Sequence, residues 1–287
     1  FSRPSGFISY CVVPDPATRQ VYPDHQTFFG MQGGFNDTVK VIPFLGVRWI
    51  LDGHLDWGRI EPDRPGQLDE MLQKADGLEK LKESPGKAFT EYKVGSENRN
   101  WTLYTTLSAH VCNAPKWSDI PETRGDNGAH GALKPEYEKY WGDYCRKIAK
   151  LYREANPDKT RIYQVTWEPE YPWGYKGSPE QLVKIFEIAY PAIKEADPKG
   201  IVAGIGGGSI MTPWMEELVK AGLLKYIDAI SVHPYTSSPE LQLLGQTIAQ
   251  KNACAAAGRK DIQFYGTEQG FATKENVALE IEQARNL

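Results

Sequence analysis

From Arg161 onward, short runs of apolar residues alternate with longer segments in which apolar residues recur every three or four positions. The first pattern is typical of buried strands, and the second is typical of helices with one buried face. The runs predict four strands, at Arg161–Trp167, Ile201–Gly207, Asp228–Tyr235 and Ile262–Gly270. Because a helical pattern follows each run, we expect parallel strands that are joined by helical crossovers.

The helix that follows the first of these strands carries signals for its start and for its end. Ser178 can cap it, Pro179 suits its first turn, and Gln181 completes a capping box. Pro191 is expected to kink this helix or to end its regular part. Gly222 is expected to end the next helix along the chain.

The first half of the chain shows the same two patterns less regularly. Three more strands are predicted, at Ser5–Val13, Leu45–Asp52 and Trp101–Ala109. Helices are predicted at about 68–82 and 135–155, and the polar segment 83–100 is predicted to be a surface insertion. The seven strands fit an α/β fold, a (β/α)8 TIM barrel whose eighth strand is missing from this chain. We therefore expect one barrel domain over residues 1–287 that is truncated at its C-terminus.

Composition and charge narrow the range of partners. The chain has 287 residues and a net charge of −4 with no basic stripe, which argues against binding to nucleic acid. No apolar run reaches the ~18 residues that a membrane span requires. The chain opens at FSRPSG without an initiator methionine, which indicates a processed product or an excised segment. A secreted or periplasmic location is favoured, and the oligomeric state is left open.

The four cysteines do not predict a metal or redox site. Cys11, Cys112, Cys145 and Cys254 form no CxxC pair, so we expect no zinc site and no thioredoxin-like site. Their even number is compatible with disulfides and equally with buried thiols. No HExxH motif occurs among the five histidines. Neither a metal nor an organic cofactor is expected.

The residues suited to chemistry fall where the predicted strands end. Glu168, His233, Tyr235 and Glu268 all occupy such positions, and the sites of parallel barrels and sheets form at that edge. One glutamate at a strand end is most often a surface charge or an ion-pair partner. Two that face one another can cleave a glycosidic bond. One protonates the leaving oxygen, and the other attacks the anomeric carbon or activates water.

Several segments resemble glycoside hydrolases of clan A, most of all those of family 39 and its relatives. LGVRWILDGHLDWGRIEPDRPGQLDEML is similar to the family's second strand and to the loop and helix that follow it. YQVTWEPEYPWGYKGSPEQLVKIFEIAYPAIKEADP resembles the acid/base segment and its helix. ISVHPY and FYGTEQG resemble the sixth strand and the nucleophile strand. The order and spacing of these segments together carry the resemblance.

The resemblance implies a retaining β-glycosidase that acts on an oligo- or polysaccharide by double displacement. It implies that Glu168 is the general acid/base and that Glu268 is the nucleophile. It also implies that Tyr235 donates a hydrogen bond to Glu268 and that His233 lines the same edge. The residue types agree with these roles, because tryptophans near Glu168 disfavour its charged form while a tyrosine hydroxyl favours an ionised nucleophile.

The sequence departs from the family pattern in three ways. Trp167 stands where the family usually has an asparagine that binds the 2-hydroxyl of the sugar, and an indole has one donor and no acceptor. Leu51 stands where the family often has an arginine. The eighth strand, which in this clan commonly brings an aromatic platform, is not found, and this suggests a truncated chain because an open barrel would expose two strand edges. The first two departures, above all Trp167, support an alternative, which is a carbohydrate-binding barrel that no longer hydrolyses its ligand.

Further candidates for sugar binding have competing structural roles. His110 falls at the end of the third predicted strand. Trp117, Trp167 and Trp173 fall near the expected mouth, where an aromatic ring can stack on a sugar or seal the core. Glu170 is the rival acid, two residues beyond Glu168.

One glycine-rich segment raises a different function. GIGGGS, residues 204–209, follows a predicted strand and precedes a helix, as a dinucleotide-binding loop does. Its third glycine position holds Ser209, however, and no acidic residue ends the next strand. A tight barrel loop is therefore the favoured interpretation, and a nucleotide-dependent oxidoreductase is a remote alternative.

Overall fold

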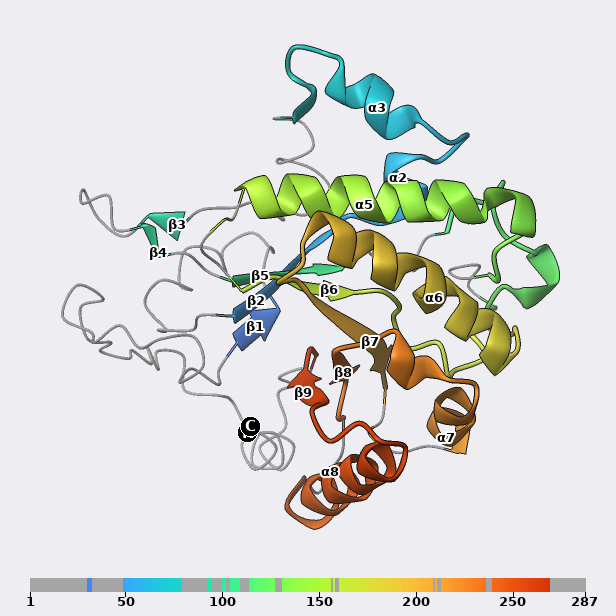
Figure 1. Ribbon diagram of the computed structural model, residues 1–287, viewed down its shortest axis with the longest axis vertical. Helices are drawn as coiled ribbons and strands as arrows, with labels where there is room; N and C mark the ends of the chain where they lie inside the picture. Colours follow the sequence, from blue (N-terminus) through green and yellow to red (C-terminus); the bar gives the residue numbers. More distant parts are fainter. Residues whose placement is uncertain are drawn as a thin grey trace, which may run out of the picture.

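The computed structural model is built around one parallel β-sheet with helices on its outer side (Figure 1). It describes residues 30–32, 49–78, 92–93, 100–101, 104–108, 114–126, 131–155, 157, 160–208, 210, 213–235 and 239–268.

The sheet has seven strands that pair in the order of the chain. They are β1 (Gly30–Gln32), β2 (Trp49–His54), β5 (Tyr104–Ser108), β6 (Ile162–Gln164), β7 (Ile201–Gly207), β8 (Ala229–Val232) and β9 (Gln263–Gly266). Each strand is parallel to the next. A doubly wound open sheet would reverse its strand order at a switch point, and this sheet does not. The parallel α/β fold is thus confirmed, whereas closure into a barrel and the missing eighth strand stay predictions.

The strand layout has two features that the sequence does not predict, β1 and a separate antiparallel pair. The sequence does not predict β1, because its three residues GMQ contain no apolar run to signal a strand. The predicted strand at Ser5–Val13 lies outside the described residues. Near the predicted insertion, β3 (Tyr92–Lys93) and β4 (Asn100–Trp101) form a separate antiparallel pair.

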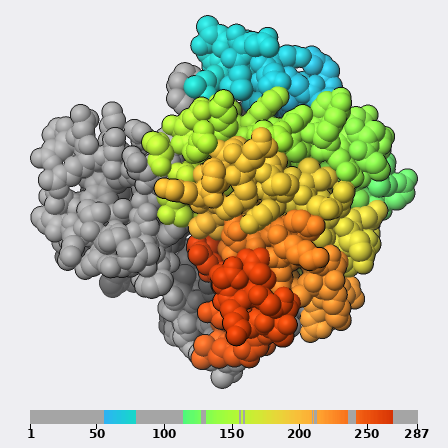
Figure 2. Space-filling view, viewed as in Figure 1, coloured from blue at the N-terminus to red at the C-terminus, as the bar shows by residue number. Residues whose placement is uncertain are grey.

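The described helices follow the strands in turn. They are α2 (Trp57–Ile60), α3 (Gln67–Leu72), α5 (Glu138–Ala155), α6 (Pro179–Ala196), α7 (Pro213–Lys220) and α8 (Pro239–Ala256). Short 3-10 turns lie at Pro121–Thr123, Pro135–Tyr137 and Leu223–Lys225. The helices α5 to α8 form a continuous outer layer (Figure 2). In the part of the chain that is described, no helix is long and apolar enough to cross a membrane.

The capping signals of α6 are confirmed. The Ser178 hydroxyl accepts a hydrogen bond from the Gln181 amide at 3.2 Å, and the Gln181 side chain accepts one from the Ser178 amide at 2.9 Å. Of the two effects expected of Pro191, a kink or an end to the regular helix, the second does not occur, because α6 continues to Ala196. Pro191 lies on the exposed face, where water can satisfy the carbonyl that loses its partner.

The other predicted helix ends gave mixed outcomes. Gly222, which has a left-handed backbone with φ of 97°, follows α7 as expected. The helix predicted at about 68–82 is interrupted, because α3 ends at Leu72 and helical structure resumes at 77–78. Gly77 explains the early end, because the chain turns back there so closely that a Cβ would lie 1.7 Å from the Met71 carbonyl oxygen.

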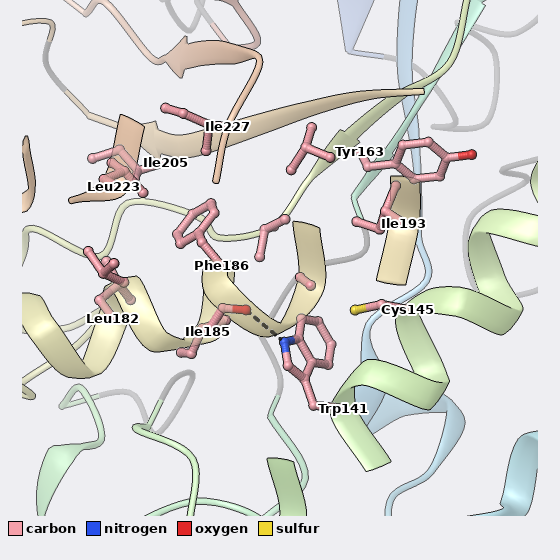
Figure 3. Close-up of a cluster of buried hydrophobic side chains, with 14 of the residues drawn as sticks. Trp141, Cys145, Tyr163, Leu182, Ile185, Phe186, Ile193, Ile205, Leu223 and Ile227 are labelled. Atoms are coloured by element: carbon pink, nitrogen blue, oxygen red, sulfur yellow. Dashed lines mark hydrogen bonds between the residues drawn. The ribbon is translucent and has the colours of Figure 1, made fainter. Parts of the chain in front are cut away.

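Most of the core lies between the sheet and α5 and α6. The Trp141 indole of α5 donates a hydrogen bond to the Ile185 carbonyl of α6 at 3.0 Å (Figure 3). Phe186 packs toward β7, where a Cβ on Gly204 would lie only 2.7 Å from its ring. Cys145 and Cys254 are buried free thiols, which excludes a disulfide between them. Cys11 and Cys112 lie outside the described residues.

The amino-terminal edge of the sheet carries buried charges that are paired. Arg161, just before β6, contacts Asp197 through two nitrogens at 2.5 and 2.8 Å. The Tyr163 hydroxyl donates to the same carboxylate at 2.8 Å. Burial opposes ionisation of Asp197, but these hydrogen bonds and the guanidinium charge outweigh it and lower the pKa of Asp197. Nearby, the Asp228 carboxylate accepts hydrogen bonds from Tyr190 at 3.0 Å and Lys194 at 3.1 Å.

Candidate active site

The carboxyl-terminal edge of the sheet brings together residues that are far apart in the sequence. Glu168 follows β6, His233 and Tyr235 follow β8, and Glu268 follows β9. These strands belong to the consecutive series β6-β7-β8-β9, in which all strands run in one direction. The ends of the strands therefore meet at one edge, and the four side chains meet with them.

His233 lies between the two glutamates. Its Nδ1 is 2.7 Å from Glu168 Oε1 and 3.8 Å from Glu268 Oε2. An ionised carboxylate only accepts hydrogen bonds, so Nδ1 carries the hydrogen when Glu168 is charged. The His233 side chain is fully buried, while Glu168 and Glu268 keep 14% and 21% of their side chains exposed. The histidine is thus fixed inside the protein and the carboxylates reach the surface.

Glu168 has an unusual backbone conformation. Its φ is 41°, and it is the one non-glycine residue with a positive φ in the part of the chain that the structure describes. Residues with a Cβ rarely adopt this region, and such strain is held in place by the surroundings. Here the Glu168 amide donates to the Gly206 carbonyl at 2.7 Å. Gly174 lies so close that a Cβ there would be 2.3 Å from the Glu168 carbonyl oxygen.

The glycine run at the end of β7 ties the two segments together. The carbonyl of Gly206 binds the Glu168 amide, and the carbonyl of Gly207 accepts from the His233 amide at 2.6 Å. Gly206 has a φ of 61°, and its amide donates to the Ser231 hydroxyl at 2.8 Å. Residues 204–207 of the GIGGGS segment belong to β7 itself, so most of this segment is strand, and the contacts of Gly206 and Gly207 go to the protein's own backbone and to Ser231.

Tyr235 is placed as the family resemblance implies. Its hydroxyl donates a hydrogen bond to Glu268 Oε1 at 2.6 Å. Partial burial, followed by the hydrogen bond to Glu268 and the charge of that carboxylate, raises the pKa of Tyr235. The phenol therefore stays protonated and remains a donor to the Glu268 carboxylate throughout the neutral range.

Trp167 contacts His233. The two rings meet edge to face, with centroids 4.5 Å apart and planes at 61°. The indole thus holds the imidazole in place, at the position where the family usually has an amide. His233 Nε2 is buried and makes no hydrogen bond among the described residues.

The remaining sequence candidates have different surroundings. Trp117 donates its indole N–H to the Glu61 carbonyl at 3.0 Å and packs edge to face on Trp57 and Tyr137. These contacts favour the core-sealing role that the sequence leaves open for it. Trp173 is exposed and stacks on Tyr171. His110 lies outside the described residues.

Sequence reasoning missed two residues at this edge. Tyr171 stacks on Trp173, and its place in the aromatic segment EYPWGY was an available signal. Gln164 is fully buried, and neither its amide nitrogen nor its amide oxygen makes a hydrogen bond among the described residues. Side chains of an extended chain point alternately to its two sides, so Gln164, four residues before Glu168, could have been expected on the same side as Glu168. No cluster of three or more histidine, cysteine or acidic side chains in the described ranges could hold a metal ion.

Comparison with known proteins found similarity in structure alone. No model of a protein family matches the chain, and no curated protein matches it in sequence. Among solved structures, it is similar to a GH39 β-xylosidase from Caulobacter crescentus, with a TM-score of 0.55 and 14% identity. That match covers 90% of this chain and 57% of the other. The fold is that of these glycoside hydrolases.

Two further structures agree with that finding. A GH39 enzyme from Xanthomonas axonopodis pv. citri has a TM-score of 0.54 at 15% identity, covering 90% of this chain and 54% of its own. A glucosidase from Croceicoccus marinus has a TM-score of 0.50 at 12% identity, covering 92% and 52%. The chain thus spans between half and three fifths of the length of these proteins. The resemblance seen in the sequence is confirmed at the level of the fold.

Proposed function

We propose that this chain is the catalytic part of a retaining β-glycosidase that acts on an oligo- or polysaccharide. Glu168 serves as the general acid/base, and Glu268 serves as the nucleophile. The solved structures of similar fold include a β-xylosidase and a glucosidase, so β-xylosides and β-glucosides are the first substrates to test.

The separation of the two carboxylates carries the proposal. Glu168 Oε1 and Glu268 Oε2 lie 2.7 Å and 3.8 Å from the same His233 nitrogen, and the sum of these distances, about 6.5 Å, is the upper limit on their separation. Retaining enzymes hold their carboxyl groups about 5–5.5 Å apart, whereas inverting enzymes need about 6.5–9.5 Å to admit a water. Because the two oxygens can be no farther apart than the lower edge of the inverting range, the geometry favours a reaction that retains the anomeric configuration.

The contacts of each glutamate suit its proposed role. In the first step, Glu268 attacks the anomeric carbon while Glu168 gives its proton to the leaving oxygen, which forms an ester between the sugar and Glu268. In the second step, Glu168 takes a proton from water, which attacks the anomeric carbon and frees Glu268. The hydroxyl of Tyr235 supports the charge of Glu268, and the ring of His233 orients Glu168.

The carbohydrate-binding barrel without activity stays the alternative. The departure that motivates it is Trp167, which brings no acceptor to the site. Its packing on His233 gives the indole a positioning role instead. Binding of oligosaccharides with no release of product would select this alternative.

Turnover of aryl β-glycosides by Glu268→Gln tests the proposal. We expect a loss of about 10⁴-fold or more, because the amide cannot form the glycosyl intermediate. Glu217→Gln is the matched control, since Glu217 is exposed on α7. NMR of the first product formed by the parent should show the β anomer. An α anomer as the first product, or parental rates for Glu268→Gln, would reject the mechanism.

A further inference from the structure

The segment after Glu168 presents two aromatic rings to solvent. Tyr171 and Trp173 are 37% and 36% exposed, although both are large and apolar. Their rings are nearly parallel, at 15°, with centroids 5.8 Å apart. This offset leaves part of each ring face uncovered and makes a stepped aromatic surface, which we call the Tyr171–Trp173 shelf.

The backbone beneath the shelf is fixed by a neighbouring loop. Asp126 donates its amide to the Pro172 carbonyl at 3.0 Å, and Lys176 donates its amide to the Thr123 carbonyl at 2.9 Å. Gly125 lies so close that a Cβ there would be 2.0 Å from the Trp173 carbonyl oxygen. The backbone that carries the two rings is therefore held in place before any ligand binds, which lowers the entropic cost of binding.

The shelf begins beside the acid/base. The Tyr171 ring lies over Gly208, where a Cβ would come within 2.3 Å of it, and Gly208 follows the glycine pair that binds Glu168 and His233. Partial burial raises the pKa of Tyr171, and the charges of Glu170 and Glu168 raise it further, as expected for a phenol close to these carboxylates.

We propose that the Tyr171–Trp173 shelf binds the sugar ring on the leaving-group side of the scissile bond, so that the preferred substrates are chains of several sugars. This inference rests on the proposed function. The acid/base gives its proton to the leaving oxygen, so the surface next to Glu168 faces the leaving group, whereas Tyr235 and Glu268 face the sugar that is attacked. The apolar face of a sugar packs on aromatic rings.

The test compares two kinds of substrate on Trp173→Ala and Tyr171→Ala. We expect kcat/KM for β-linked tetrasaccharides of xylose, glucose or mannose to fall at least tenfold more than kcat/KM for the corresponding β-glycosyl fluorides. The fluoride leaving group places no ring on the shelf. Tyr226→Ala is the matched control, because Tyr226 precedes β8 at the opposite edge of the sheet. Equal losses for both kinds of substrate would overturn the shelf and leave the hydrolase intact.

A binding measurement separates failure of the shelf from failure of the hydrolase. If the parent cleaves no glycoside, the proposed function fails, and the shelf is judged by tryptophan fluorescence titrated with the same tetrasaccharides. Saturable quenching that Trp173→Ala weakens at least tenfold supports the shelf. Unchanged affinity in that variant, or no binding by the parent, overturns it.

Discussion

The two ends of the β-sheet place their polar groups under opposite conditions. At the amino-terminal edge, the buried carboxylate of Asp197 receives two hydrogen bonds from Arg161 and one from Tyr163. At the carboxyl-terminal edge, His233 Nε2 and the Gln164 side chain are buried without a hydrogen bond among the described residues. The buried Asp197 carboxylate at the amino-terminal edge is thus fully hydrogen-bonded, whereas two buried side chains at the carboxyl-terminal edge have polar atoms without a hydrogen bond among the described residues.

This difference indicates that the amino-terminal edge of the sheet serves stability and that the carboxyl-terminal edge serves function. A buried polar group without a partner costs about 1–3 kcal/mol, so groups of this kind mark places that are kept for a purpose other than stability. Glu168 adds backbone strain at the same end. Changes at the amino-terminal edge should therefore alter stability, while changes at the carboxyl-terminal edge should alter activity.

After Glu268→Gln, the largest effect is expected for Glu168→Gln at the carboxyl-terminal edge. The amide cannot donate the proton, so kcat/KM should fall about 10²–10⁴-fold for oligosaccharides, whose leaving groups are poor. For aryl glycosides with very acidic leaving groups the loss should be much smaller. Unfolding temperatures should change little, because His233 Nδ1 can still donate to the amide oxygen. A uniform loss across leaving groups would contradict the acid/base role.

At the amino-terminal edge, Asp197→Ala should lower the free energy of unfolding by about 3–5 kcal/mol, because it leaves the Arg161 guanidinium buried without its anion. Kinetic constants per folded molecule should not change. Asp261→Ala is the control, since the Asp261 side chain is 70% exposed and its ion pair with Arg259 should contribute less than about 1 kcal/mol.

The contribution of the Arg161–Asp197 ion pair to stability should also depend on pH. The pKa of Asp197 is lowered in the folded state, so its contribution is present above the usual Asp value of about 4 and is lost as the pH falls through the folded value. Asp197→Asn should therefore flatten the fall in stability below about pH 4, measured by denaturant unfolding at several pH values. An unchanged acid dependence would show that other carboxylates govern it.

The smallest effect is expected for glycines. Gly206→Ala should cost about 1–3 kcal/mol, because φ is 61° there and the Cβ would lie 2.7 Å from the Thr166 carbonyl oxygen. It should also reduce activity, since the Gly206 carbonyl anchors Glu168. Gly245→Ala in α8, with open space around its Cβ, should stabilise by up to about 1 kcal/mol and leave kinetics unchanged. Similar stability changes for both variants, measured by denaturant unfolding, would contradict this account.

Some elements of the fold could be predicted from the sequence and others could not. The capping box at Ser178 and the stop at Gly222 are local features, and the structure has both. β1 and the early end of α3 were not predictable in this way, because three residues give no period and the turn at Gly77 depends on a close approach to Met71. Trp117 gave no local sign of its packing on Trp57 and Tyr137.

The sequence by itself determined the alternation of strands and helices and the placing of Glu168 and Glu268 beyond strand ends, because periodicity and capping act over a few neighbouring residues. Only the tertiary structure decided how these glutamates meet around His233, because their segments lie on strands separated by about 100 residues of chain. The left-handed backbone of Glu168 was decided in the same way, since it depends on the Gly206 carbonyl of another strand. Distances of this kind are set by the packing of whole elements, which no short stretch of sequence specifies.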